Sequence, residues 1–166
     1  MTGVAEPLYT NVESPIGELL LLSDGHVLCG LHMQEGRKAV RIKPTWRRSE
    51  EPFTNVREQL EEYFAGQRFR FDLPLGLRGT PFQLRVWRAL QEIPYGDRLT
   101  YGALASRVGR PFAARAVGHA NGSNPISVVL PCHRLVGANG ALVGYGGGLE
   151  RKQFLLSLEA RAGALT

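Results

Sequence analysis

One short stretch constrains the fold of this chain more than any other, the segment 124–135, which reads NPISVVLPCHRL. Pro131 cannot extend a strand ladder and fixes its own φ, so the apolar run before it is expected to end there. The fold must then place Cys132 at the exit of a buried segment, where a turn can present its thiol to a pocket. A neighbouring base or cation lowers the pKa of a thiol, and His133 and Arg134 supply both kinds of group.

This segment also has a plainer interpretation. Neighbours on an extended strand point to opposite faces, so Cys132 and His133 need not meet. A buried structural thiol followed by two surface residues is compatible with the composition alone. The rest of the chain has to decide between the two.

The composition describes an ordinary globular protein of one domain or two small ones. The chain has 166 residues, of which 43% are hydrophobic and 21% are charged. No apolar stretch approaches the roughly 18 residues that span a bilayer, and the N-terminus lacks the pattern of a signal peptide. Cys29 and Cys132 stand in dissimilar contexts and do not suggest a disulfide, so a cytoplasmic location is expected.

The two halves differ in charge. Residues 1–79 carry 10 Lys and Arg against 11 Asp and Glu, a net charge of −1. Residues 80–166 carry 10 against 4, a net charge of +6, so the whole excess of +5 belongs to the second half. A basic half beside a neutral one suggests a polyanion such as nucleic acid as its partner, although a merely soluble basic protein has the same balance.

The first half reads as a small sheet followed by a helix. Short apolar runs cut by Pro and Gly turn signals predict a three-stranded antiparallel meander over Leu8–Glu13, Glu18–Leu22 and Val27–Met33. Residues 37–51 read as a loop with a short helical turn, and Thr54 as the cap of a helix that ends near Ala65. A further short strand is predicted over Phe69–Leu73, before a Pro- and Gly-containing linker over Leu73–Gly79.

The second half reads as helical. Thr80-Pro81 opens a helix to about Ile93, with Trp87 flanking its apolar face. Thr100 caps a second helix over Tyr101–Val108, and a third follows over about Phe112–Asn121. The last two, joined by a Gly-containing turn, form a plausible helix-turn-helix.

The second helix of that pair has almost no side-chain bulk. Its small residues are Ala113, Ala114, Ala116, Gly118 and Ala120. Arg115 and His119, four residues apart, share one face. Such a helix suits either a tightly packed core or a nucleic-acid groove, and the basic charge of this half favours the groove.

The last part of the chain is Gly-rich and then helical. Residues 137–148 contain six Gly and no Lys-Ser/Thr pair, which excludes a P-loop. Close backbone approach to a flat ligand and an irregular surface loop remain as alternatives. A final amphipathic helix is predicted over Leu149–Ala160, with Glu159 near its end.

Taken together, these segments resemble the O6-alkylguanine-DNA alkyltransferases in their short bacterial form. The blocks that carry the resemblance are GTPFQLRVWRAL (79–90), IPYGDRLTYGALA (93–105), ARAVGHANGSNP (114–125), LPCHRL (130–135) and GYGGGLERK (144–152). The family implies an α+β fold, with an N-terminal ribonuclease-H-like α/β domain (1–76) and a mostly α C-terminal domain (77–166) that contains a winged helix-turn-helix. It also implies direct-reversal DNA repair, a single-turnover transfer of the alkyl group from a flipped-out O6-alkylguanine to the protein's own cysteine.

The resemblance implies a role for individual residues. Cys132 matches the acceptor, His133 the base that deprotonates it through a water, Glu159 the acid that orients the histidine, and Asn124 the asparagine that ties the recognition helix to the Cys segment. The substrate-binding residues implied are Tyr101, Leu135, Tyr145 and Gly146. The DNA-binding residues implied are Arg115, Ala114, Ala116, Gly118, Ala120 and Arg134, with Arg115 filling the place of the flipped base.

The expected partner is therefore double-stranded DNA bound through its minor groove, by a monomer, with cooperative binding left open. No metal, cofactor or membrane is expected, and alkylated thymine remains open as a second substrate. Two other functions are compatible with parts of this sequence. One is a recognition protein on the same scaffold, which the intact Cys132 disfavours. The other is a cysteine hydrolase, which leaves the basic helix-turn-helix unexplained.

Overall fold

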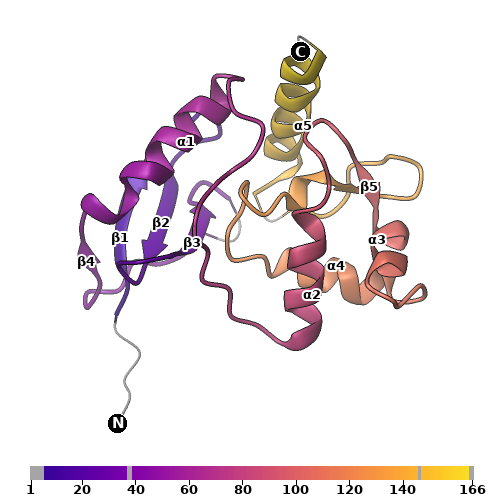
Figure 1. Ribbon diagram of the computed structural model, residues 1–166, viewed down its shortest axis with the longest axis horizontal. Helices are drawn as coiled ribbons and strands as arrows, with labels where there is room; N and C mark the ends of the chain where they lie inside the picture. The colour runs from indigo at the N-terminus through magenta and orange to yellow at the C-terminus, as the bar shows by residue number, and fades with distance from the viewer. Residues whose placement is uncertain (1–5, 37–38, 146, 165–166) are drawn as a thin grey trace.

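The computed structural model describes residues 6–36, 39–145 and 147–164 (Figure 1). A sheet covered by one helix forms the N-terminal region, and a group of helices forms the C-terminal region. The C-terminal helix lies between them at the top of the view. The chain is thus an α+β protein, as expected, and no helix within the described ranges is long and apolar enough to cross a membrane.

The predicted three-stranded meander is confirmed. Its strands are β1 (Leu8–Val12), β2 (Leu19–Ser23) and β3 (Leu28–Met33), and each pairs antiparallel with the next. A fourth strand, β4 (Arg47–Arg48), adds parallel to β1 and gives the order β3-β2-β1-β4. This strand lies within the segment predicted as a loop, and two exposed arginines gave no alternating pattern from which to predict it.

Two local predictions in the first half were wrong. Residues 69–73, all of them described, form no strand, because the Gln59 side chain bonds both backbone groups of Asp72, at 2.9 and 2.8 Å. Thr54 is the first residue of α1 (Thr54–Phe64) rather than its cap. A 3₁₀ turn, η1 (Glu51–Phe53), leads directly into that helix, so the Thr54 hydroxyl donates backward to the Glu51 carbonyl instead.

The helices of the second half follow the predicted caps. Thr80 and Gln83 form a reciprocal capping box at the start of α2 (Pro81–Leu90). Thr100 accepts a hydrogen bond from the Ala103 amide at the start of α3 (Tyr101–Arg107). The helix α4 (Ala114–Gly122) packs against both α2 and α3.

Trp87, predicted to flank the apolar face of α2, lies inside the core. Its indole nitrogen donates to the Ala120 carbonyl at 2.8 Å and so fixes α2 against α4. Two short strands, β5 (Leu99–Thr100) and β6 (Leu135–Val136), pair in parallel and anchor the start of α3 to the chain that follows the Cys segment.

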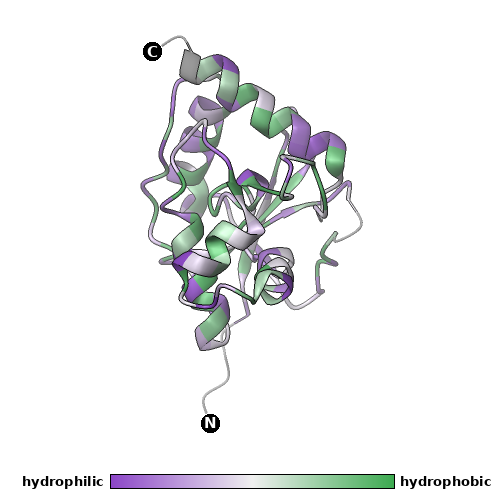
Figure 2. Cartoon of the chain, turned by 90° about the vertical axis from the view of Figure 1, so that its right-hand side faces the viewer, coloured by the Kyte–Doolittle hydropathy of each residue, from purple (hydrophilic) through white to green (hydrophobic). Residues whose placement is uncertain are grey.

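The last helix, α5 (Leu149–Ala164), is four residues longer than predicted. Figure 2 shows apolar and polar residues interspersed along it, as an amphipathic helix requires. Its buried side chains join a hydrophobic cluster to which both halves contribute. Because that cluster is continuous, the division at residues 76 and 77 stays a prediction.

Candidate active site

The Cys segment is held by the edge of the N-terminal sheet. The Leu31 amide donates to the Pro125 carbonyl at 2.9 Å, and the Ser127 amide donates to the Leu31 carbonyl at 3.1 Å. Val128 then takes a φ of 71°, a left-handed conformation that a β-branched residue rarely adopts. The apolar run before Pro131 is therefore buried, as expected, but it forms one bridge and a tight turn rather than a regular strand.

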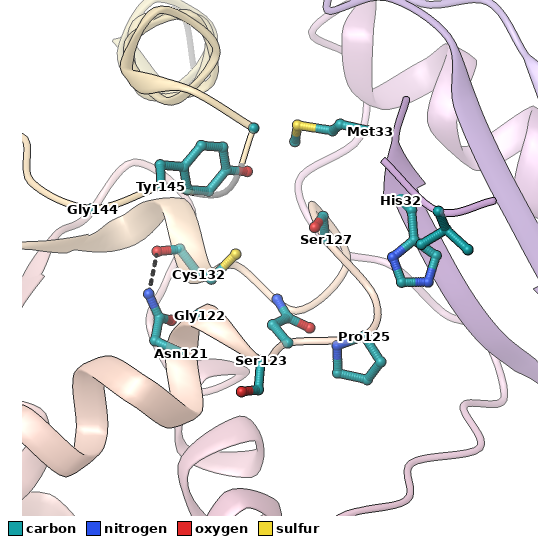
Figure 3. A pocket seen from close by; sticks show the side chains of 13 residues that line it. His32, Met33, Asn121, Gly122, Ser123, Pro125, Ser127, Cys132, Gly144 and Tyr145 are labelled. Carbon is teal, nitrogen blue, oxygen red and sulfur yellow. Dashed lines mark hydrogen bonds between the residues drawn. The ribbon is translucent and has the colours of Figure 1, made fainter. Parts of the chain in front are cut away.

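Pro131 opens a 3₁₀ turn, η2 (Cys132–Arg134), and Cys132 faces a cavity of about 290 Å³ (Figure 3). Cys132 as a whole is 5% exposed. The cavity runs from the end of α4, past Asn124 and Tyr145, to side chains of β3. The sequence thus predicted correctly that the turn presents a buried thiol to a pocket.

The thiol is held in its protonated form. Burial raises the pKa of Cys132, and this outweighs the lowering by the neighbouring Asn124 and Tyr145 side chains and by the charge of Lys152. Since the thiolate is the nucleophile, a base must remove the proton at the moment of reaction.

The base nearest in sequence is buried and already oriented. His133 is 0% exposed, and its Nε2 lies 2.7 Å from Oε2 of Glu159, a residue of α5 that is 1% exposed. A carboxylate only accepts hydrogen bonds, so Nε2 carries the hydrogen and Nδ1 presents its lone pair. Among the described residues, Nδ1 has no hydrogen-bond partner.

Glu159 is the centre of a larger polar cluster than the sequence suggested. Arg134 donates to it through two nitrogens, at 2.8 and 3.0 Å, and the Tyr63 hydroxyl donates at 2.7 Å. The remaining guanidinium nitrogen of Arg134 donates to the Ile93 carbonyl at 2.6 Å. With His133, three side chains thus hold the Glu159 carboxylate, and the Gly96 amide donates to it as well, at 3.4 Å.

Charge and burial act in opposite senses on this pair. Burial alone would raise the pKa of Glu159, but hydrogen bonds and charge from His133 and Arg134 lower it to about 2. Burial lowers the pKa of His133, and Glu159 only partly offsets this. At neutral pH the cluster therefore contains an ionised Glu159 and a neutral His133, the forms that a base needs.

Asn124 is a tether within the Cys segment. Its amide nitrogen donates to the Leu130 carbonyl at 2.9 Å, and its oxygen accepts from the Ile126 amide at 2.9 Å. Asn121, which the sequence reasoning missed, donates to the Cys132 carbonyl at 3.4 Å from the end of α4. Asn121 therefore connects α4 to the segment that carries the thiol, whereas both side-chain bonds of Asn124 lie within that segment rather than between it and α4.

Of the predicted substrate-binding side chains that the structure describes, Tyr145 alone lines the cavity. The Tyr101 hydroxyl donates to the Val143 carbonyl at 3.3 Å. Lys152, also missed, places its ammonium 6.0 Å from the Tyr101 ring centre and 5.9 Å from that of Tyr145. Leu135 is buried in β6, whereas Gly146 lies outside the described residues.

The predicted DNA-binding residues separate into two groups. Arg115 and Ala116 are exposed on α4, and Ala114 and Gly118 are partly exposed. Two others are not available on that surface. Ala120 is buried, with its carbonyl bonded to Trp87, and Arg134 is locked in its bidentate pair with Glu159.

One exposed residue beside α4 was not singled out from the sequence. Phe112, in the turn before α4, has a relative exposure of 101%, whereas the other large exposed hydrophobic side chains among the described residues lie between 37% and 48%. No Asp or Glu occurs between Asp97 and Glu150, so the segment that contains α3, α4 and η2 has no acidic side chain of its own.

Comparisons with known proteins agree on one family. Residues 81–161 match the family described as 6-O-methylguanine DNA methyltransferase, DNA binding domain, and residues 8–77 match its ribonuclease-like domain. The methylated-DNA–protein-cysteine methyltransferase of Mycolicibacterium paratuberculosis is 52% identical over 153 residues, 92% of each chain. That of Methanosarcina acetivorans is 49% identical over 151 residues, 91% of this chain and 97% of the relative.

Solved structures give the same result. A crystal structure of Mycobacterium tuberculosis OGT in complex with DNA superposes with a TM-score of 0.87 at 48% identity, covering 93% of this chain and 94% of that one. The O6-methylguanine-DNA methyltransferase from Pyrococcus kodakaraensis superposes with a TM-score of 0.60 at 25% identity, covering 92% and 98%.

Proposed function

The chain belongs to the 6-O-methylguanine DNA methyltransferase family, and from this premise we propose that it repairs alkylated DNA by taking the alkyl group of O6-alkylguanine onto Cys132. The observation that carries the proposal is the arrangement around Cys132. A buried thiol opens on a cavity, and the next residue is a buried histidine already oriented by an ionised acid.

The proposed reaction is an exchange of a proton for an alkyl group. The thiol proton passes to the lone pair on His133 Nδ1, directly or through one water, as Glu159 stabilises the positive ring. Sγ then bonds to the carbon attached to O6, the C–O6 bond breaks, and its electron pair stays with the guanine. The guanine regains one proton and leaves as the undamaged base, whereas the thioether remains on the protein.

The raised pKa of Cys132 supports this order of events. A thiol that stays protonated at rest resists oxidation and adventitious alkylation. It becomes a nucleophile only when a substrate excludes water and the base acts. No second cysteine is near Cys132 in the sequence, which supports one turnover per molecule.

The base must leave the duplex to reach this cavity, because O6 lies within the base stack. We assign the DNA contact to α4, with Arg115 entering the place of the flipped base through the minor groove. The small side chains of Ala114, Ala116 and Gly118 permit close approach of the helix backbone. The acid-free segment around α4 supports the same surface, since acidic side chains would repel phosphates.

Phe112 belongs to the proposed surface as well. An apolar ring that is fully exposed beside Arg115 is suited to contact sugar edges or a base step in a groove. The remaining parts of the proposal are a monomeric protein and a cytoplasmic location, and cooperative binding on DNA stays open.

The direct test is the mass of the intact protein after mixing with a duplex that contains one O6-methylguanine, followed by peptide mapping. We expect a gain of one methylene mass on the Cys132 peptide, saturating at one per protein. An unchanged mass with lesion-selective binding would favour a recognition protein. An unchanged mass without binding would return the cysteine hydrolase to consideration.

A further inference from the structure

The cavity beside Cys132 has a wall that none of the sequence motifs contains. Its N-terminal side is formed by His32, Met33 and Val40, opposite Ser127 and Cys132 (Figure 3). In this view the sulfur of Cys132 points across the cavity, and the His32 ring faces it from the edge of the sheet.

The register between β3 and the Cys segment places these side chains. Leu31 and Ile126 form a parallel bridge and are both 0% exposed, so they point into the core. Because side chains alternate along extended backbone, the next residue of each chain, His32 and Ser127, points to the opposite side. Both therefore reach the same cavity from neighbouring backbones.

The side chains of Met33 and His32 differ in how tightly they are packed. Met33 is buried, and its sulfur packs so closely on Gly147 that a Cβ at position 147 would overlap it. His32 is only partly buried at the rim. Burial lowers the pKa of His32, so its ring is neutral at physiological pH and can lie against an apolar group without a charge to desolvate.

The geometry of the reaction directs larger adducts toward this wall. The reacting carbon must lie within bonding reach of Cys132 Sγ, and further carbons extend from it into the remaining cavity. Tyr145 and Asn124 stand next to the sulfur, whereas the small side chain of Ser127 leaves an open path. The group beyond that path is His32.

We propose that His32 is a specificity-determining residue, whose ring limits the size of the alkyl group that the Cys132 cavity accepts from O6 of guanine. This inference rests on the proposed function and adds a selectivity filter to it. The filter belongs to the N-terminal sheet, although the reacting groups belong to the other half.

The test compares transfer rates from duplexes with O6-methylguanine and with O6-benzylguanine, for wild type, His32→Ala and His32→Trp. We expect His32→Ala to raise the benzyl rate about tenfold and leave the methyl rate within about twofold, the size of effect that pocket shape produces. His32→Trp should lower the benzyl rate by a similar factor. His26→Ala, an exposed histidine in the preceding turn, is the matched control.

The outcomes separate the two proposals. A benzyl-to-methyl ratio that is the same in all variants would overturn the role of His32 and leave the proposed function intact. Equal changes in both rates would overturn it as well, since a size filter must discriminate. No transfer to wild-type Cys132 from either duplex would overturn the proposed function itself. Denaturant unfolding of each variant shows that rates are compared between folded proteins.

Discussion

The two cysteines of this protein lie in regions that surround the thiol with very different groups. Cys29 is half-buried in β3, and its thiol donates a hydrogen bond to the Val27 carbonyl, at 3.6 Å. Cys132 is buried, yet it has a histidine as the next residue and hydrogen-bonding side chains around it. Burial raises the pKa of both thiols, so neither is reactive by its pKa alone. The difference lies in what surrounds each thiol. A choice by solvent exposure alone would select Cys29, whereas the surroundings favour Cys132 as the nucleophile.

The largest expected effect comes from removing each thiol in turn. Cys132→Ala should abolish alkyl transfer and leave DNA binding largely intact, because this buried side chain is not part of the proposed DNA surface. Cys29→Ala should transfer at the wild-type rate. Intact-protein mass and a lesion-binding assay measure both. Transfer that persists in Cys132→Ala would end the assignment.

Replacing Glu159, the acid that holds His133, should have the next largest effect. Glu159→Gln keeps the size but removes the charge, so His133 loses the negative charge that stabilises its protonated ring, and Arg134 becomes a buried charge without an ion partner. We expect transfer to slow about a hundredfold or more and the free energy of unfolding to fall by about 3–5 kcal/mol. Quenched-flow kinetics measure the transfer rate, and urea unfolding measures the free energy of unfolding. Glu150→Gln, an exposed acid on the same helix, should change neither.

Low pH should destabilise the protein by protonating Glu159 and His133, the buried pair beside Cys132. The pKa of Glu159 is lowered from 4.5 to about 2, so its stabilising contribution is complete above pH 4.5 and is lost as the pH falls toward 2. The pKa of His133 is lowered from 6.5, so its contribution begins to fall already near pH 6.5. Urea unfolding from pH 7 to pH 3 should show both phases. Glu159→Gln should lack the lower one.

Substitution of Arg115 tests the residue proposed to help an alkylated base reach Cys132. Arg115→Ala should slow repair of duplex DNA about tenfold, since base flipping costs a few kcal/mol that an inserted side chain offsets. Attack on the free alkylated base needs no flipping and should be unaffected. Arg88→Ala, an exposed arginine on α2, controls for lost positive charge. Equal losses on both substrates would contradict an inserted Arg115.

Phe112 should give the smallest effect. Phe112→Ala should weaken duplex binding about threefold to tenfold, at the low end of what aromatic contacts to bases contribute, without changing attack on the free base. Phe69→Ala, a partly exposed ring in the first half, is the matched control. If both substitutions behave alike in fluorescence titrations with duplex DNA, Phe112 does not belong to the DNA surface.

The sequence predicted well what local chemistry decides. The Thr80 and Thr100 caps, the three-stranded meander and the turn at Pro131 each depend on residues a few positions apart. The pairing of Glu159 with His133 came from the family resemblance, since nothing in the local pattern links residues 26 positions apart.

The sequence failed where a long-range partner overrides the local pattern. Arg134 was predicted to bind DNA, because the sequence does not show that its carboxylate partner lies on another helix. Asp72 was assigned to a strand because the Gln59 side chain that binds its backbone is 13 residues away. His32 stood in an ordinary strand, and only the register with Ser127 shows that it faces the thiol.

The hydrogen bond made by the Tyr63 hydroxyl limits how the two halves of this protein could be separated or recombined with those of a relative. It comes from α1 and bonds the carboxylate of Glu159, 96 residues later in the chain. A chimera that joins the first half of one relative to the second half of another would have to match this hydroxyl, the Leu31 backbone and the Met33 sulfur at once. The two halves therefore cannot be exchanged independently between relatives. Selection on the reaction at Cys132 also constrains residues of the first half.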